Sequence, residues 1–134
     1  MSTRSNPLVL LVDDEEAFLE IASMKLAAAG CAIVETHNAQ EAFIKAHEAQ
    51  PDLVLSDIYM PPGLNGWELA MALQDDPITR NIPITLFSSL NDPQAEFQGD
   101  QGRMTLLLRD ITILSKTDDI DTLGELTIHM IKKN

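Results

Sequence analysis

Short apolar runs alternate along the chain with stretches in which apolar residues recur at helical spacing. The first run, Leu8 to Val12, is continuously apolar and ends at two aspartates, which is typical of a parallel strand buried on both faces. Comparable runs predict four further strands, at residues 31–36, 53–57, 82–87 and 111–114.

Helical periodicity fills most of the intervals between these strands. It predicts four helices, over residues 15–29, over 39–49 behind an Asn38 cap, from Asn65 toward Pro77, and from Asp118 or Asp119 onward. Residues 90–110 fit two interpretations equally well, a shortened helix with an extra strand or a normal helix with a long loop, because Gly99 and Gly102 interrupt the pattern.

The alternation of strands and helices indicates an α/β domain. Strands that alternate with helices are joined by right-handed crossovers and form a parallel sheet. Five such strands with helices on both faces of the sheet make a three-layer sandwich. The length of 134 residues corresponds to one domain, which we place at 1–134. In such sheets ligands bind beyond the carboxyl ends of the strands, so the residues just after each strand are the candidates for chemistry.

Composition narrows the classes of partner. Nine Lys and Arg against 21 Asp and Glu leave a net charge of −12, which opposes binding to nucleic acid or an anionic membrane and suits a metal cation or a basic protein surface. The single cysteine, Cys31, excludes an internal disulfide framework and a cysteine-rich zinc site, and a reducing cytoplasm is its natural compartment. The first apolar run is too short for a signal-peptide core or a membrane span.

Polar residues with matched chemistry follow the predicted strands. Asp13 and Asp14 follow the first, Asp57 ends the third, Ser88 follows the fourth and Lys116 follows the fifth. Three crowded carboxylates repel one another, which favours a hard divalent cation such as Mg²⁺ between them, and a lysine offsets the remaining charge. Taken singly, each has a structural alternative, since acidic residues also stabilise the start of a helix and an isolated lysine is usually a solvated charge.

The sequence resembles the receiver domain of two-component response regulators over nearly its whole length. The resemblance is carried by Leu11-Val12-Asp13-Asp14-Glu15, Leu55-Ser56-Asp57-Ile58-Tyr59-Met60-Pro61, Asn65-Gly66, Ile82-Pro83-Ile84 with Ser88, and Lys116. It implies a flavodoxin-like sheet of strand order 2-1-3-4-5, here as a stand-alone domain with an atypical fourth-helix region. It also implies phosphorelay signal transduction in the cytoplasm, by a protein that is not an enzyme beyond assisting its own phosphorylation and dephosphorylation.

The same resemblance implies roles for individual residues. Asp57 would accept a phosphoryl group from the phosphohistidine of a sensor histidine kinase or a phosphotransfer protein, forming an aspartyl phosphate. Asp14 and Asp57 would bind Mg²⁺ directly, together with the backbone carbonyl of Tyr59, and Asp13 would bind it through water. The signal would then pass to an unknown downstream protein through protein–protein contacts.

The resemblance also implies roles for Lys116 and Ser88, but the sequence departs from the family at two nearby positions. Lys116 would contact a phosphoryl oxygen, and the Ser88 hydroxyl would move to hydrogen-bond the phosphoryl group. Thr117 stands where proline is usual, and because a cis bond before a non-proline residue costs about 2.5–4 kcal/mol we expect a trans peptide there. Ile113 replaces the usual Tyr or Phe, so the aromatic rotation that transmits activation in many relatives cannot occur at this position.

The remaining departures concern loops. The interval from Ser88 to Lys116 is 28 residues (116−88), several longer than usual, and its extra length falls within 90–110. Pro62-Gly63 lengthens the loop after the third strand by one residue, and Ser89 stands where Ala or Gly is common. Because the family's output face includes the fourth helix, we expect an unusual output surface.

Two alternatives to a phosphoacceptor stay open. A Mg²⁺-dependent phosphatase of the haloacid dehalogenase type also uses an aspartyl phosphate, but it needs an Asp-x-Asp arrangement, whereas Asp13 and Asp14 are adjacent, and a cap domain for which the chain has no room. A pseudo-receiver that binds a partner without phosphorylation is favoured by Ile113 and Thr117 and opposed by the complete set of strand-end residues.

Overall fold

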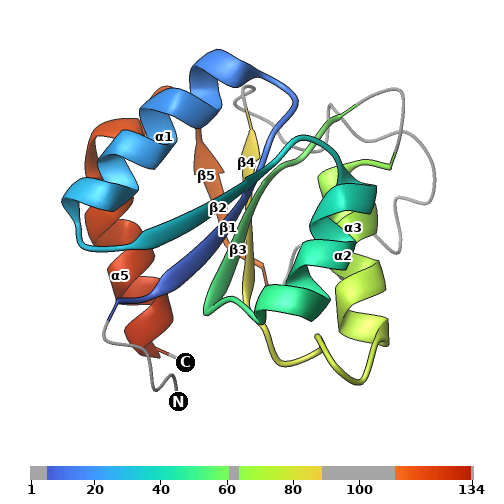
Figure 1. Cartoon of the computed structure of the whole chain (residues 1–134). Coiled ribbons are helices and arrows are strands. Elements are labelled where there is room, and N and C mark those ends of the chain that lie inside the picture. The colour runs from blue at the N-terminus through green and yellow to red at the C-terminus, as the bar shows by residue number, and fades with distance from the viewer. Residues whose placement is uncertain (1–5, 61–63, 89–110, 134) are drawn as a thin grey trace.

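In the computed structural model the chain forms a five-stranded parallel sheet between two layers of helices (Figure 1). The structure describes residues 6–60, 64–88 and 111–133. The strands lie in the order β2-β1-β3-β4-β5, which confirms the predicted fold class. Their bounds are β1 (Leu8–Val12), β2 (Ala32–Thr36), β3 (Leu53–Asp57), β4 (Ile84–Ser88) and β5 (Ile113–Ser115).

Two helices cover each face of the sheet in the part of the chain that the structure describes (Figure 1). One face carries α1 (Glu16–Ala28) and α5 (Leu123–Lys133), and α5 follows a short 3₁₀ turn, η2 (Ile120–Thr122). The other face carries α2 (Ala39–Ala49) and α3 (Gly66–Asp75). The predicted atypical fourth-helix region, residues 90–110, lies outside the described residues.

The central strand shows why its sequence is apolar without interruption. Successive side chains of a strand point to opposite faces of the sheet. Val9 and Leu11 pack into the core under α1 and α5, whereas Leu10 and Val12 pack into the core under α2 and α3. All four have at most 1% of their surface exposed. Both layers are therefore anchored on the strand that leads to the first aspartates.

Three strands begin later than predicted, and the first of these, β2, begins at Ala32 rather than at residue 31. β4 begins at Ile84 rather than at residue 82, because Pro83 has no N–H to donate to the sheet, although its carbonyl accepts the N–H of Val54 at 2.9 Å. β5 begins at Ile113 rather than at residue 111. The predicted start of the last helix at Asp118 or Asp119 corresponds to η2, for which Asp119 is the N-terminal cap.

Within the described ranges, no helix has the length and apolar character needed to cross a membrane.

Candidate functional site

The carboxyl ends of the parallel strands bring the predicted polar residues to one edge of the sheet. Asp13 follows β1, Asp57 ends β3, Ser88 ends β4 and Lys116 follows β5. Because β1 pairs with β3, β3 with β4 and β4 with β5, these residues lie on successive neighbouring strands. Residues separated by 103 positions (116−13) therefore meet through the topology of the sheet alone.

Asp13 is a fully buried carboxylate at this edge. Its Oδ1 accepts a hydrogen bond from the backbone N–H of Glu15 at 2.8 Å, which holds the side chain against the start of α1. Its Oδ2 lies 2.8 Å from Lys116 Nζ. Burial raises the pKa of Asp13 above its ordinary value of 3.8, and the neighbouring ammonium only partly opposes this effect.

Asp57 shares the same ammonium group. Its Oδ2 lies 3.4 Å from Lys116 Nζ, and 8% of the residue is exposed. Burial and then the negative charge of Asp13 raise the pKa of Asp57 to about 7, against the opposing effects of Lys116 and of the Tyr59 N–H. A carboxyl group shifted this far by burial and by a like charge is typical of a functional site.

Lys116 lies between the two carboxylates and is held from other sides as well. Its Nζ lies 4.5 Å from the centre of the Phe18 ring, a cation–π contact, and its backbone N–H donates to the Ser88 carbonyl at 3.0 Å. Burial lowers the pKa of Lys116, but Asp13 and Asp57 outweigh it and leave the pKa above 10.5. The side chain is therefore a permanent positive charge in the pocket.

Sequence reasoning missed the contribution of Phe18. Its apolar side chain at helical spacing predicted only a core position, and nothing in the sequence signals that a lysine lies on its ring. The ring also packs edge-on against Phe87 of β4, with centroids 5.2 Å apart. Phe18 thus contacts both the Lys116 ammonium and the core between α1 and the sheet.

Asp14 completes a cluster of three carboxylates. Oxygen atoms of Asp13, Asp14 and Asp57 all lie within 4.8 Å of one another. Asp14 is exposed, whereas the other two are buried, so the cluster opens to solvent on the side of Asp14. Hard, anionic oxygen ligands in this number suit Mg²⁺, which retains several water ligands, and the residues present therefore fit such an ion.

The other predicted residues lie at or just beyond the same strand ends. Ser88 is buried at the end of β4, with 1% exposed. Tyr59 lies two residues beyond Asp57 with an exposed side chain. Gly66 begins α3 so close to Asp57 that an added Cβ would stand 1.9 Å from its carbonyl oxygen. Only glycine lets α3 begin against the end of β3.

A comparison with known families decides what kind of domain this is. The model of the response regulator receiver domain matches residues 9–122. The chain belongs to the receiver domain family of response regulators. Members of this family act in two-component signal transduction and bind Mg²⁺ at an acidic pocket, and in this receiver domain Asp13, Asp14 and Asp57 form such a cluster.

The receiver domain is similar to several curated response regulators, and it spans less than half the length of PhoB and PleD. It is 36% identical over 91 residues to the phosphate regulon transcriptional regulatory protein PhoB of Pseudomonas aeruginosa, which covers 68% of this chain and 39% of PhoB. It is 34% identical over 94 residues to the polar-differentiation response regulator DivK of Brucella anthropi, covering 68% of this chain and 76% of DivK. The match to the response regulator PleD of Caulobacter vibrioides spans 20% of PleD.

Solved structures agree on the fold. The chemotaxis response regulator CheY4 of Vibrio cholerae superposes with a TM-score of 0.75 at 24% identity, over 95% of this chain and 99% of CheY4. A response regulator from Chloroflexus aurantiacus superposes with a TM-score of 0.79 at 19% identity, over 96% and 99%. At these identities the likeness establishes the flavodoxin-like fold alone.

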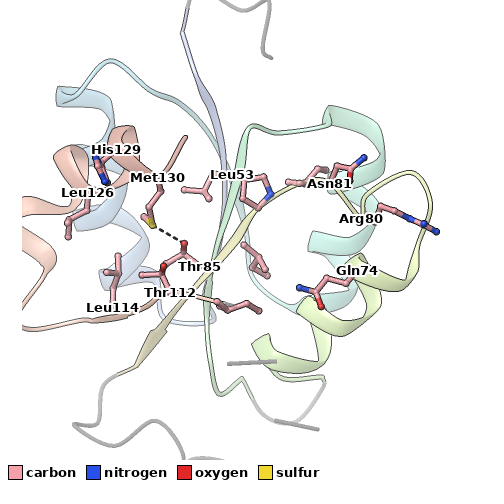
Figure 2. Close-up of a pocket in the computed structure, with 14 residues that line it drawn as sticks. Leu53, Gln74, Arg80, Asn81, Thr85, Thr112, Leu114, Leu126, His129 and Met130 are labelled. Carbon is pink, nitrogen blue, oxygen red and sulfur yellow. Dashed lines mark hydrogen bonds between the residues drawn. The ribbon is translucent and has the colours of Figure 1, made fainter. Parts of the chain in front are cut away.

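A second hollow, which the sequence did not reveal, lies at the opposite edge of this receiver domain (Figure 2). Its volume is about 600 Å³, and its lining includes Leu53 and Ile84, the first residues of β3 and β4. Thr85 Oγ1 donates to Met130 Sδ across it, at 3.1 Å. The described residues that line it include no aspartate or glutamate, so this hollow does not share the chemistry of the acidic edge.

Proposed function

We propose that this receiver domain accepts a phosphoryl group on Asp57 from the phosphohistidine of a sensor histidine kinase or a phosphotransfer protein, in a Mg²⁺-dependent reaction. The observation that carries the proposal is a cluster of three carboxylates, two of which share one ammonium. Lys116 Nζ lies 3.4 Å from Asp57 Oδ2. Carboxylate oxygens of Asp13, Asp14 and Asp57 lie within 4.8 Å of one another. A nucleophile, a cation site and a fixed positive charge are what phosphoryl transfer requires.

The transfer is an in-line displacement at phosphorus. A carboxylate oxygen of Asp57 attacks the phosphorus atom, the P–O bond forms as the P–N bond breaks, and the imidazole nitrogen of the donor takes the electron pair. Mg²⁺, when bound, neutralises charge on the phosphoryl oxygens. We assign Asp14, Asp57 and the Tyr59 carbonyl to direct contact with the ion. Asp13 is assigned to contact through water, since the Glu15 N–H and Lys116 already engage both of its oxygens.

Lys116 and Ser88 act on the transferred group. The Lys116 ammonium, supported by the Phe18 ring, stays charged and is in reach of an oxygen on the phosphorylated Asp57. The Ser88 hydroxyl donates to another phosphoryl oxygen after the end of β4 moves toward it. The hydrogen bond between the Ser88 carbonyl and the Lys116 N–H, 3.0 Å long, makes these two strand ends respond together.

We further propose that the signal passes to a downstream protein by protein–protein contact in the cytoplasm, and that residues 1–134 act as one domain. The net charge of −12 supports a partner with a basic surface and opposes nucleic acid. The domain carries out no turnover beyond its own phosphorylation and dephosphorylation.

The test is phosphorylation of the purified chain by acetyl phosphate with Mg²⁺, followed by intact mass. Wild type should gain one phosphoryl group, and the gain should disappear with EDTA or in Asp57→Asn. Asp75→Asn, which removes an exposed carboxylate at the end of α3, is the matched control and should be phosphorylated like wild type. A wild-type chain that gains no mass, and shows no change in Trp67 fluorescence with beryllofluoride, would favour the phosphorylation-independent pseudo-receiver.

A further inference from the structure

We propose that Asn65 is a positioning residue for the metal site, because its side chain fixes the direction in which the Tyr59 carbonyl points. The inference rests on the proposed function, in which that carbonyl is a ligand of Mg²⁺. Asn65 is the N-cap residue of α3, and its Oδ1 accepts the backbone N–H of Met60 at 2.8 Å. This hydrogen bond connects the start of α3 to the segment that follows Asp57.

The Tyr59 carbonyl and the Met60 N–H belong to one peptide unit. A trans peptide is planar, and its N–H and C=O point in opposite directions. The bond that holds the Met60 N–H toward Asn65 therefore turns the Tyr59 oxygen to the opposite side. A hydrogen bond at the N–H also polarises the amide, which strengthens the carbonyl oxygen as a ligand. Asn65 thus acts on the oxygen without touching it.

The residues on both sides of Tyr59 are already fixed. The side chains of Ile58 and Met60 are each only 2% exposed. The Ile58 N–H donates to the Phe87 carbonyl at 2.9 Å, and the Ile58 carbonyl accepts the Gly66 N–H at 3.1 Å. The peptide between Tyr59 and Met60 is the next unit along, and the Asn65 side chain supplies the hydrogen bond that orients it.

Asn65 is itself held by the helix that it begins. Its backbone N–H donates to Glu68 Oε1 at 2.9 Å, one turn into α3. Gly66, the next residue, lies against the Asp57 carbonyl, where an added Cβ would be 1.9 Å from the oxygen. The start of α3 is therefore locked to the end of β3, and Asn65 transmits that position to the Tyr59 carbonyl.

The test is the affinity of the whole chain for Mg²⁺ alone, measured by calorimetry and by the rise in Tm with Mg²⁺ concentration. Asn65→Ala should weaken binding about tenfold or more, as is typical when a residue that orients a ligand is removed. Asn65→Asp keeps an acceptor oxygen for the Met60 N–H and should bind within about twofold of wild type. Asn65→Ser still caps a helix but is too short to reach Met60, so it should bind as weakly as the alanine variant.

The matched control is Asn38→Ala. Asn38 caps α2, where its Oδ1 accepts the Glu41 N–H at 2.8 Å. This variant should lose Tm as the Asn65 variants do and keep wild-type affinity for Mg²⁺. In phosphorylation by acetyl phosphate, Asn65→Ala should need about tenfold more Mg²⁺ for half-maximal rate and reach nearly the wild-type maximum at saturation.

The outcomes separate the inference from the proposed function. Failure of wild type to bind Mg²⁺ would overturn both. If wild type binds Mg²⁺ and both Asn65→Ala and Asn65→Ser bind it equally well, the positioning role is wrong and the proposed function stands. If Asn65→Ala and Asn38→Ala weaken Mg²⁺ binding equally, Asn65 acts only as a helix cap and the positioning role is wrong. If the alanine variant does not fold, the comparison of Asn65→Ser with Asn65→Asp decides.

Discussion

Replacing Asp57 with asparagine should stabilise the metal-free domain, by an amount that grows with pH. Burial and the charge of Asp13 raise the pKa of Asp57 from 3.8 to about 7 in the folded chain. Between these two pKa values the folded state holds a proton that the unfolded state has released. This contribution to stability is complete below about pH 3.8 and is lost as the pH rises through about 7. The whole difference corresponds to about 4 kcal/mol at about pH 8. Asparagine keeps the shape of the side chain and carries no charge to bury.

The assay is urea unfolding of wild type and Asp57→Asn, followed by circular dichroism in EDTA at a series of pH values. The variant should gain up to about 4 kcal/mol over wild type at about pH 8 and little at about pH 4. Saturating Mg²⁺ should reduce that advantage, because an ion that binds only the folded wild type adds about 2.7 kcal/mol at one hundred times its Kd. Asp75→Asn, at an exposed position, should show no such trend. A pH-independent difference, or a less stable Asp57→Asn at alkaline pH, would refute the electrostatic reasoning.

Three further predictions concern other contacts. When protonated, the His47 ring donates to the Phe43 carbonyl and the Asp76 carboxylate, each at 2.9 Å, and these bonds raise the pKa of His47. His47→Gln should therefore lower the urea midpoint below about pH 6, and the loss should vanish as the pH rises through that raised pKa. Gly66→Ala should cost about 2 kcal/mol or more in urea unfolding and slow phosphorylation, because the added Cβ meets the carbonyl of Asp57, the proposed phosphoacceptor. Lys116→Met should lower the free energy of unfolding by about 3 kcal/mol above pH 7 in EDTA, because it leaves two buried carboxylates without their cation. For the same reason, calorimetry should show that this variant binds Mg²⁺ more tightly than wild type.

The fold was predictable because the strands are short, apolar and separated by strong helix signals. β1 and β3 have the bounds that were predicted for them, and β1 is apolar throughout because it is buried on both faces of the sheet. β4 and β5 begin two residues later than predicted (84−82 and 113−111), because apolar residues precede the first paired residue of each strand, most clearly at Pro83. Hydrophobic periodicity reports burial, and burial is only an approximate guide to pairing.

The site was predictable to the level of which side chains share an edge, and no further. The rule that ligands bind beyond the carboxyl ends of strands selects Asp13, Asp57, Ser88 and Lys116 from sequence alone. It predicts that Lys116 offsets the charge of the carboxylates, but not which oxygen faces its ammonium, nor that the Phe18 ring contacts the ammonium. These depend on side-chain packing between elements distant in the sequence, which no local pattern encodes.

The charges of the pocket explain why a neutral hydroxyl suits the position of Ser88. Three carboxylates and one ammonium sum to −2 (−3 + 1), and Mg²⁺ brings the sum to zero. Phosphorylation of Asp57 replaces one carboxylate charge by about two phosphoryl charges, which leaves the pocket near −1. A second lysine would give the Mg²⁺-bound pocket a charge of about +1 and would weaken its affinity for Mg²⁺ by repulsion. Under the proposed function, the hydroxyl adds no charge at rest and donates a hydrogen bond once the phosphoryl oxygens are present, so the movement proposed for Ser88 would respond to the charge that phosphorylation adds. With Ile113 in place of an aromatic residue, that movement is expected to reach β5 through the backbone hydrogen bond from Lys116 to Ser88.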